Sequence, residues 1–377
     1  MKVNLCDICD FQGGSQPPKS QWTTLQQDGY IRMLQIRDFT QPGKVKAEYV
    51  KLTNTTKCCL KDDILIARYG ASLGKILTGL SGAYNVAMTK AVPNEAIISK
   101  KFLYYFLCSD TFQNCILNVG VRAAQAGFNK EDLSNIELYC PDLSIQNKMC
   151  KILESVDVLI IKSKLQLDKL DLLVKSRFIE MFGDPIVNPK GWSQEKLVKR
   201  CNIITGNTPS RTNLHYYGDY IEWIKSDNIT GNLILTKASE FLSEEGLNVG
   251  RSVDKDSILM TCIAGSLKSI GNVAIANRKV AFNQQINAIV TNKEETYFMY
   301  EQFKLAKTYL TSDINMSLKG ILNKSQLGNK KFIFPPLVLQ KEFANFFAQV
   351  DKSKLAIQQS LDELETLKKS LMQQYFG

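Results

Sequence analysis

The side chains that most often catalyse reactions or hold metal ions are sparse in this chain. Its one histidine, His215, lies in the segment NLHYYGDY. A metal site built on histidines, or a Ser-His-Asp triad for acyl transfer, needs histidine as a ligand or as a base. Such sites are therefore almost excluded, and we expect His215 to lie in a loop or on a binding surface.

The ten cysteines offer one possible metal site. Cys6 and Cys9 have a Cys-x-x-Cys spacing that, together with the adjacent pair Cys58 and Cys59, can in principle hold zinc. The second pair is adjacent, however, and the second half of the chain has no matching set. We interpret the cysteines as reduced and mostly buried small hydrophobic side chains, and we expect no metal site.

Three further catalytic signatures are incomplete or missing. The segment GASLGK imitates a phosphate-binding loop, but Ile76 stands where that loop needs Ser or Thr for magnesium. No Glu-x-Lys, the metal-binding signature of many nucleases, occurs in the sequence. The internal Pro-Pro pairs, in QPPK and FPPL, lack the Asn or Asp and the aromatic residue that an amino-methyltransferase uses. We therefore expect no catalytic centre and a chain that is not an enzyme.

The charge balance points to a polyanionic partner. The 377 residues include 47 Lys and Arg against 37 Asp and Glu, which gives a net charge of +10. Such a chain is attracted to nucleic acid or to an acidic membrane surface. No apolar run is long enough to cross a bilayer, and the opening segment MKVNLCDICDF does not resemble a signal peptide. We expect a cytoplasmic protein.

The sequence contains an internal repeat. One offset superimposes Pro141, Leu143 and Gln146 on Pro335, Leu337 and Gln340, and Lys175-Ser176 on Lys369-Ser370. The same offset places Phe182-Gly183 on Phe376-Gly377. With small insertions, DFQGGSQPP corresponds to NIITGNTPS, IRMLQIRDFT to IEWIKSDNIT, AYNVAM to AFNQQI and GFNKEDL to GILNKSQL. Each unit of the repeat is thus a variable block followed by a better-matched tail.

The two tails are predicted to be long helices. Ile145, Met149, Ile152 and Val156 recur at helical spacing, and Leu339, Phe343, Phe346 and Val350 repeat the pattern. A helix from Ser144 to Phe182 would be about 58 Å long. Because an apolar stripe of that length needs a partner, we expect the two tails to pack against each other as a coiled coil.

The variable blocks are predicted to be compact and rich in strands. Short apolar runs such as DILIARYG and SILMTCIAG are separated by Gly, Asn, Asp and Ser. Each block also has a later helical stretch, Ser99 to Leu117 and Tyr297 to Leu310. The prediction is an α+β fold with four parts, at residues 1–141, 142–183, 184–335 and 336–377.

Two blocks, two matched helices ending in MFGDP and YFG, and no catalytic motif form a specific combination. The chain resembles the specificity (S) subunit of type I restriction-modification systems over its full length. TGNTPS, IEWIKSDNIT and FNQQI look like phrases of that family's target-recognition domains, and RFIEMFGDP looks like the end of its central helix. The first block departs from these phrases, with GGSQPPKS and NVAM, which weakens the assignment of single residues there.

The resemblance implies a non-catalytic DNA-specificity subunit with two α/β target-recognition domains, each reading half of a bipartite target. It implies two antiparallel helices that space these domains with pseudo-twofold symmetry and dock two methyltransferase subunits, which two restriction/translocase subunits then join. It implies no cofactor in this chain, with S-adenosylmethionine, ATP and magnesium on the partner subunits, and no membrane association.

Candidate DNA-binding residues follow from the loops and cations of each block, since Lys and Arg bind phosphates and forked polar side chains read bases. For the first block we select Gly13, Gly14, Ser15, Gln16, Lys19, Arg37, Arg68, Ser72, Lys75, Arg122, Gln125 and Lys130. For the second block we select Gly206, Asn207, Thr208, Ser210, Arg211, Lys225, Asp227, Ser266, Lys268, Asn283, Gln284, Gln285, Lys319 and Lys324. The alternative for any of them is a solvated surface position, and for Asn283 also a structural turn.

Three alternatives to this function remain open at the level of sequence. One is a specificity subunit of a methyltransferase-only complex that lacks the motor nuclease. The second is a self-sufficient nuclease or methyltransferase with an unfamiliar centre. The third is an interaction scaffold whose basic charge is incidental.

Overall fold

The computed structural model describes residues 2–120, 127–316 and 319–377. Its internal contacts divide the chain into two compact units. Unit 1 consists of Met1–Lys164 and Gln359–Gly377, and unit 2 of Leu165–Gln358. Because both dividing points fall inside long helices, each unit contains one block and a piece of each helix. The four-part domain division stays an interpretation of the sequence.

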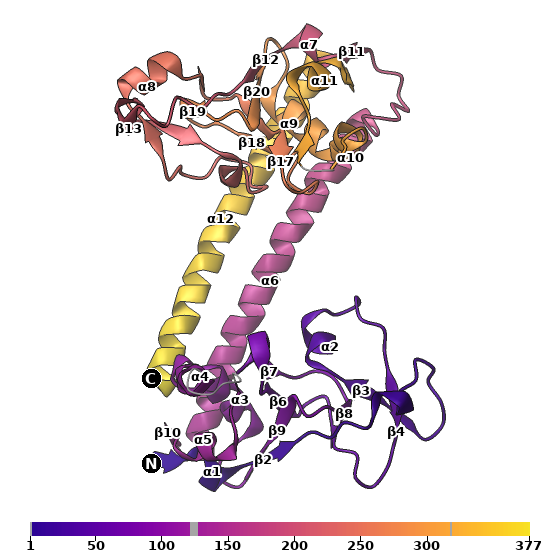
Figure 1. The fold of residues 1–377 in the computed structure, drawn as a ribbon, viewed down its shortest axis with the longest axis vertical. Helices are drawn as coiled ribbons and strands as arrows, with labels where there is room; N and C mark the ends of the chain where they lie inside the picture. The colour runs from indigo at the N-terminus through magenta and orange to yellow at the C-terminus, as the bar shows by residue number, and fades with distance from the viewer. Residues whose placement is uncertain (1, 121–126, 317–318) are drawn as a thin grey trace. The chain divides into compact units, whose positions relative to one another are not determined.

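Unit 1 contains two four-stranded sheets and one two-stranded sheet (Figure 1). The first sheet is antiparallel and has the order β2 (Cys9–Gly13), β9 (Met88–Pro93), β6 (Ile64–Ala67), β7 (Ile76–Leu77). The second has the order β4 (Tyr49–Lys51), β3 (Tyr30–Leu34), β8 (Gly82–Tyr84), β5 (Cys58–Cys59), with β3 parallel to β8. The small sheet pairs β1 (Lys2–Asn4) with β10 (Glu137–Tyr139).

Helices complete the block of unit 1. These are α1 (Leu5–Ile8), α2 (Ile36–Thr40), α3 (Lys100–Cys108), α4 (Asp110–Gly120) and α5 (Lys130–Ser134), with short 3₁₀ turns η1 (Lys19–Gln21) and η2 (Gly70–Ser72). The predicted single stretch from Ser99 to Leu117 is two helices, because Ser109 intervenes. The Ser109 hydroxyl donates to Phe106 O (2.7 Å) and accepts from Phe112 N (3.4 Å), which ends one helix and starts the next.

Unit 2 repeats the three sheets of unit 1 and adds a fourth. The first has the order β12 (Cys201–Thr205), β20 (Ile286–Thr291), β16 (Ile258–Thr261), β18 (Val273–Ile275). The second has the order β14 (Phe241–Leu242), β13 (Tyr217–Ile224), β19 (Val280–Phe282), β15 (Ser252–Val253), with β13 parallel to β19. Two-stranded sheets pair β11 (Gln194–Lys196) with β22 (Lys331–Ile333), and β17 (Ile263–Ala264) with β21 (Gly320–Ile321).

The helices of the second block are likewise short. They are α7 (Leu197–Arg200), α8 (Glu244–Val249), α9 (Thr296–Leu305), α10 (Lys307–Thr311) and α11 (Lys324–Asn329), with η3 (Leu214–Tyr216) and η4 (Ser226–Asn228). The stretch predicted from Tyr297 to Leu310 is thus also split, at Ala306. The matching strand orders, each with its one parallel pair at the same place, confirm the repeat that the sequence predicts.

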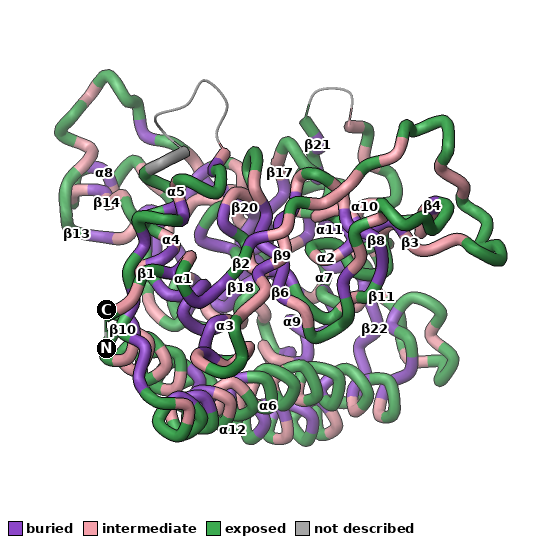
Figure 2. Tube along the Cα trace, turned by 90° about the horizontal axis from the view of Figure 1, so that it is seen from below, coloured by how far each residue is buried: buried purple, intermediate pink, exposed green. Residues whose placement is uncertain are grey.

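In each unit, segments of the long helices α6 (Leu143–Phe182) and α12 (Leu337–Phe376) lie side by side (Figure 2). Their ion pairs show that they run antiparallel within each unit. In unit 1, Asp157 pairs with Lys368 (2.6 Å) and Lys164 with Glu365 (2.8 Å). In unit 2, Lys354 pairs with Asp171 (2.6 Å) and Arg177 with Glu342 (2.8 Å). In each unit the residue number rises along α6 as it falls along α12. The α+β class with two paired long helices is therefore confirmed.

The buried face of α6 differs from the predicted one near its start. Cys150 and Leu153 belong to the core of unit 1 and Val156 is buried as well, whereas Ile145 and Ile152 are nearly half exposed. The predicted stripe is therefore wrong at these two positions and right at Val156. Among the described residues, none of the helices combines the length and the apolar character that a bilayer crossing requires.

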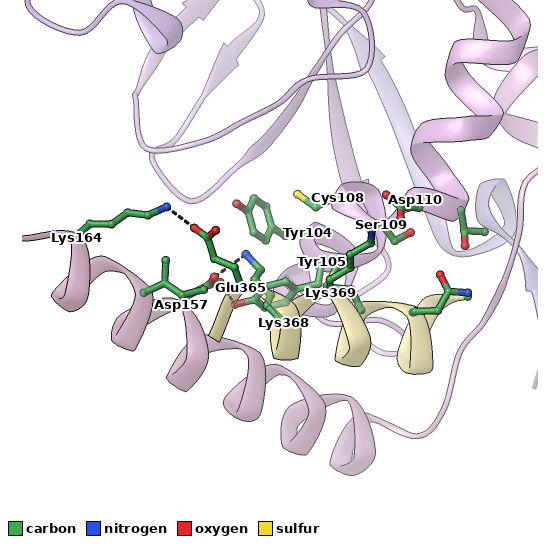
Figure 3. A pocket seen from close by; sticks show the side chains of 15 residues that line it. Tyr104, Tyr105, Cys108, Ser109, Asp110, Asp157, Lys164, Glu365, Lys368 and Lys369 are labelled. Carbon is green, nitrogen blue, oxygen red and sulfur yellow. Dashed lines mark hydrogen bonds and ion pairs between the residues drawn. The ribbon is translucent and has the colours of Figure 1, made fainter. Parts of the chain in front are cut away.

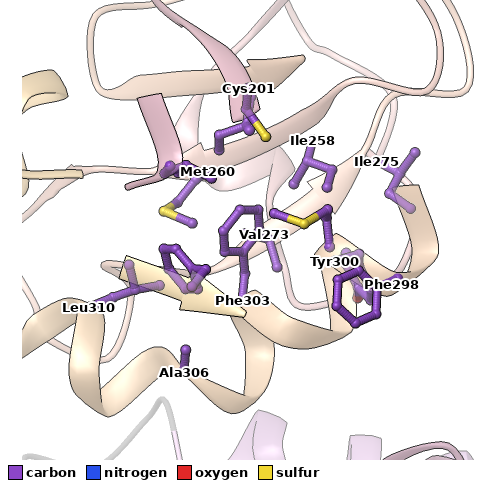
Figure 4. Close-up of a cluster of buried hydrophobic side chains, with 14 of the residues drawn as sticks. Cys201, Ile258, Met260, Val273, Ile275, Phe298, Tyr300, Phe303, Ala306 and Leu310 are labelled. Carbon is purple, nitrogen blue, oxygen red and sulfur yellow. The ribbon is translucent and has the colours of Figure 1, made fainter. Parts of the chain in front are cut away.

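The largest core lies in unit 2, between the first sheet, α9 and the ends of the long helices. Phe303 of α9 lies on the side of the cluster near Met260 of β16, and Phe298 lies on the other side, beside Tyr300 (Figure 4). Phe178 of α6 stacks on Phe298 with ring centroids 5.5 Å apart and meets Phe343 of α12 edge-on at 5.3 Å. Aromatic contacts of this kind add to the stabilisation from apolar burial.

Two buried glutamines fasten the long helices to the blocks. In unit 1, Gln146 donates to Ile97 O and Pro141 O (both 2.8 Å) and accepts from Ser99 N (2.9 Å). In unit 2, Gln340 occupies the corresponding place. It donates to Pro335 O (2.9 Å) and Glu294 Oε2 (2.5 Å) and accepts from Glu295 N (3.1 Å). Both glutamines are fully buried.

Candidate DNA interface

A glycine begins the candidate loop of unit 1 because the backbone leaves no room for a side chain. Gly14 N donates to Met88 O (3.1 Å) and Ser15 N to Tyr84 O (3.0 Å). A Cβ atom on Gly14 would lie 2.1 Å from Asn85 O and 2.5 Å from Tyr84 O. The loop that follows β2 is therefore held directly against the turn that follows β8.

The same junction occurs in unit 2. Gly206 N donates to Ile286 O (3.0 Å) and Asn207 N to Phe282 O (3.1 Å). A Cβ atom on Gly206 would lie 2.2 Å from Asn283 O. The turn residues have the same role in both units, since Asn85 Oδ1 accepts from Ala87 N (3.2 Å) and Asn283 Oδ1 from Gln285 N (3.1 Å).

These contacts favour the structural reading of Asn283. Its side chain is buried and its amide also donates to Gln285 Oε1 (3.1 Å), so its polar atoms serve the turn. The adjacent Gln284 is exposed and accepts a hydrogen bond from the Thr208 hydroxyl, which links the turn to the glycine loop. A DNA contact by Asn283 stays an untested prediction.

Beyond the glycine, the loop of unit 1 ends at a carboxylate that gathers two cations. Glu48 binds Lys19 Nζ (2.5 Å) from the loop and Arg37 Nη2 (2.8 Å) from α2, and it accepts from Gln35 Nε2 (3.0 Å). Lys19 Nζ also lies 3.8 Å from the centroid of the Trp22 ring. The hydrogen bond from Lys19 lowers the pKa of Glu48, which is therefore ionised at neutral pH.

Unit 2 has the equivalent cluster. Glu240 binds Arg211 Nη2 (2.7 Å) from the loop and Lys225 Nζ from the end of β13. The guanidinium of Arg211 lies 4.5 Å from the ring centroid of Tyr217 and 5.0 Å from that of Trp223. The hydrogen bond from Lys225 lowers the pKa of Glu240, so this carboxylate is ionised as well.

Glu48 and Glu240 occupy the same position of the repeat. The carbonyl of Glu48 accepts from Met33 N (2.8 Å), and that of Glu240 accepts from the matching Trp223 N (2.9 Å). Sequence reasoning missed both glutamates. A signal existed in the sequence, because both glutamates follow a Lys-Ala pair. Glu48 follows it directly, and Glu240 follows it after one inserted residue, Ser239.

The remaining candidates of unit 1 surround a second loop. Arg68 Nε and Nη2 donate to Phe128 O (both 3.4 Å), which joins the loop carrying Ser72 and Lys75 to the segment before α5. Lys130, the first residue of α5, pairs with Asp10 of β2 (2.9 Å). A strand, β7, follows Lys75 where a phosphate-binding loop would continue into a helix, which agrees with the rejection of GASLGK as a nucleotide site.

In unit 2 the corresponding loop carries Ser266 and Lys268. Its strand β17 pairs with β21, and Leu322 N donates to Cys262 O (2.8 Å), so Lys319 and Lys324 flank the same loop. Gln285 joins this loop to η4 and, through its neighbour Gln284, to the glycine loop. Its carbonyl accepts from Cys262 N (2.7 Å), and its side chain accepts from the Ser226 hydroxyl (3.3 Å).

The predicted residues thus gather around two linked loops in each unit. The exposed residues are Gly13, Gln16, Lys19, Arg37, Lys75, Lys130, Thr208, Ser210, Arg211, Asp227, Ser266, Lys268, Gln284, Lys319 and Lys324. Partly exposed are Gly14, Ser15, Arg68, Ser72, Asn207, Lys225 and Gln285, and buried are Gly206 and Asn283. Arg122 and Gln125 lie outside the described residues.

The cysteines and the one histidine are the side chains that bear most on catalysis and metal binding. Six cysteines are buried as expected, but Cys108 and Cys115 are exposed. Across residues 2–120, 127–316 and 319–377, no group of three or more His, Cys, Asp and Glu is placed to hold a metal ion. The one histidine, His215, is exposed in the turn η3.

A cavity of about 330 Å³ lies in unit 1 between α3, α6 and α12 (Figure 3). Four of its charged side chains form ion pairs, Asp157 with Lys368 and Lys164 with Glu365. The Tyr105 hydroxyl donates to Asp157 Oδ2 (2.9 Å), and burial raises the pKa of this phenol. Tyr105 therefore stays protonated and acts as a structural donor.

Comparison with known proteins places these features in a family. The family model for the type I restriction modification DNA specificity domain matches residues 1–169 and 189–366. The specificity subunit of the type I restriction enzyme HindI from Haemophilus influenzae is 32% identical over 119 residues. The aligned region covers 31% of this chain and spans a quarter of the length of that curated relative (25%).

Two solved structures have the same fold. One, the type I restriction-modification S subunit from M. genitalium, is 15% identical with a TM-score of 0.61 and covers 100% of this chain and 96% of its own. The other, from work on complex assembly and conformational transition of the type I R-M system, is 17% identical with a TM-score of 0.61, covering 100% and 97%. With most of its length matched by the family model, the chain belongs to the family of type I restriction modification DNA specificity domains.

Proposed function

We propose that this chain is the non-catalytic DNA-specificity subunit of a type I restriction-modification complex, in which each unit reads one half of a bipartite target. The observation that carries the proposal is the duplicated site. Each block places a glycine loop against an Asn turn and ends the loop in a cluster of cations. Two equivalent sites in one chain suit a target divided into two parts.

The exposed cations of each block supply affinity in this proposal. Lys19, Arg37 and Lys130 belong to the first site, and Arg211 and Lys324 to the second. Contacts from such groups to phosphates release counterions and make binding weaken with salt. Exposed polar side chains beside them, such as Gln16 and Gln284, are the candidates for base contacts.

The exposed apolar residues of α6 support docking of methyltransferase subunits. Val158, Leu165, Leu172 and Ile179 recur every seventh residue and are 47%, 50%, 61% and 37% exposed. A regular apolar stripe left open to solvent is typical of a surface that a partner covers. In this proposal, α6 and α12, each 40 residues long, also set the number of bases between the half-sites.

Catalysis and its cofactors reside on partner subunits in this proposal. Two methyltransferase subunits bring S-adenosylmethionine, and two restriction/translocase subunits bring ATP and magnesium. Asp157, Lys164, Glu365 and Lys368 of the α6–α12 cavity in unit 1 are engaged in ion pairs with one another, which supports a structural role for these four residues.

The test is to map methylated adenines produced by the purified chain with its methyltransferase subunits on genomic DNA. We expect one interrupted motif, two short words with a fixed unspecified spacer. Methylation of every duplex equally would refute the proposal. Turnover by the chain alone, given DNA, magnesium and S-adenosylmethionine, would instead reveal a self-sufficient enzyme. Cleavage that requires ATP separates the full restriction complex from a methyltransferase-only one.

A further inference from the structure

The carboxylates of Glu48 and Glu240 stand out because they hold cations that the proposed function would direct at DNA. Each is more enclosed than its loop partner. The side chain of Glu48 is 18% exposed against 63% for Lys19, and that of Glu240 is 34% exposed against 54% for Arg211. In each unit a partly buried anion thus anchors a more exposed loop cation, while the second cation of Glu240, Lys225, is itself only 26% exposed.

We propose that Glu48 and Glu240 are specificity-determining positioning residues, each of which orients a loop cation and a second cation, located just after the neighbouring strand β3 or β13, toward one half of the DNA target. This inference rests on the proposed function. It assigns a role in specificity to two residues that do not themselves need to contact DNA. Glu48 orients Lys19 and Arg37, and Glu240 orients Arg211 and Lys225.

Conformational entropy is the first physical reason. Lys and Arg side chains lose about 1.5–2 kcal/mol of rotamer freedom when they are fixed. A carboxylate that holds them in the free protein removes part of this cost before DNA arrives, as preorganisation does in other interfaces. A flexible cation finds a phosphate next to any sequence, whereas an oriented one favours the sequence whose geometry matches.

The second reason is the geometry of arginine. A guanidinium carries five N–H donors in a planar fork. Arg37 and Arg211 each bind their glutamate through Nη2, which leaves the other donors of the fork to meet a phosphate or the O6 and N7 edge of guanine. The two glutamates and their loop cations, Lys19 and Arg211, occupy equivalent positions in two blocks with different loops, which argues against a chance surface pair.

The charge of each glutamate predicts a change in DNA binding that would not be expected if its ion pairs only stabilised the fold. Replacing either glutamate by Gln removes one negative charge from beside two cations. Attraction to any duplex then increases, while the orientation that discriminates between sequences is lost. Non-specific binding is thus expected to tighten as selectivity falls.

Matched controls come from carboxylates that bind cations elsewhere in the same blocks. Glu222 lies on β13 and binds Arg278 through both oxygens (2.7 and 2.6 Å). Asp63 in unit 1 binds Lys90 (3.5 Å) and Lys100 (3.3 Å). Both are about as enclosed as Glu48, at 16% and 14% exposure. Glu222→Gln and Asp63→Asn therefore remove ion pairs without touching the clusters of Glu48 and Glu240.

The experiment selects bound duplexes from a random pool, using the full chain with its methyltransferase subunits. Glu48→Gln and Glu240→Gln are compared with wild type and with both controls, and thermal unfolding reports folding. Each variant is expected to lose preference in one half of the motif only, a different half for each. The ratio of specific to non-specific affinity should fall about 5-fold or more, the lower bound for one lost base-reading contact.

Three results carry distinct meanings. Loss confined to one half, with the controls unchanged, supports the inference. Retention of both halves, loss of both halves, or the same loss in the controls overturns it while leaving the proposed function intact. A wild-type complex that selects no divided motif refutes the proposed function itself.

Discussion

Replacing Gln146 by Met should destabilise unit 1 strongly, although Met has nearly the same length and shape. The amide of Gln146 satisfies three backbone groups, Ile97 O, Pro141 O and Ser99 N, at 2.8–2.9 Å. Methionine has no donor for the two carbonyls and only a weakly accepting sulfur for Ser99 N, and the fully buried site excludes water as a substitute.

The expected magnitude follows from these three groups. A buried donor or acceptor left without a partner costs about 1–3 kcal/mol, so the range is about 3–9 kcal/mol. We expect the lower end, about 3–4 kcal/mol, because two of the groups are carbonyls that tolerate loss of one partner better than an N–H does. Because the total free energy of unfolding of a protein is about 5–15 kcal/mol, this loss would be a large fraction of the stability.

The assay is urea unfolding of the full chain combined with hydrogen exchange resolved by peptide. Gln146→Met should lower protection in unit 1, at Ser99 first, and Gln340→Met should do the same in unit 2 at Glu295, whose amide its side chain accepts from. Gln166→Met, at an exposed position of α6, is the control and should change stability by less than about 0.5 kcal/mol. A loss below about 1 kcal/mol for Gln146→Met, or unchanged exchange at Ser99, would refute the reasoning.

Three further predictions concern single substitutions. Gly206→Ala places a Cβ 2.2 Å from Asn283 O, so the loop must move; we expect a loss of about 1–3 kcal/mol in denaturant unfolding and weaker selection of one half-site only, and a variant with wild-type stability and selection would contradict this. Glu301→Gln should raise Tm, because burial raises the pKa of Glu301 above its ordinary 4.5 and the charged form therefore opposes folding. Its gain should grow as pH rises from about 4.5 through the raised folded value, and equal gains at pH 5 and pH 8 would be inconsistent with that cause. Leu172→Asp, at a position 61% exposed, should leave Tm within about 1 °C of wild type but reduce co-purification of methyltransferase subunits at least about 5-fold; unchanged co-purification would exclude this part of α6 from docking.

The long helices could be predicted from sequence because their signals are local. The predicted helix from Ser144 to Phe182 differs from α6 by one residue. Gly183 ends it in a left-handed conformation (φ +79°), its N–H bonded to Ile179 O (2.8 Å), as a Gly before Asp-Pro indicates. Which face is buried was less predictable, because α6 has apolar residues on two faces. Ile145 and Ile152 fit the helical period but lie on the exposed face.

The candidate site was only partly predictable. Loops and cations could be named, since Gly and Lys or Arg mark them directly. The glutamates that gather the cations could not be found with a fixed offset, because the connections before β4 and β14 differ in length. Asn283 could be named from the sequence, but its role could not. An Asn in a turn looks the same in a sequence whether its side chain contacts a base or bonds to the backbone of the turn.

Unit 1 is assembled from segments that the ribosome produces at very different times. Phe376 is buried among the aromatic side chains of its core, 5.0 Å from the Phe102 ring, and the Thr111 hydroxyl donates to Phe376 O (2.6 Å). All of unit 2 is translated between Lys164 and Gln359. The nascent first block must therefore wait, with an apolar surface uncovered, until residues 359–377 emerge, and during that interval it is a natural client for a chaperone.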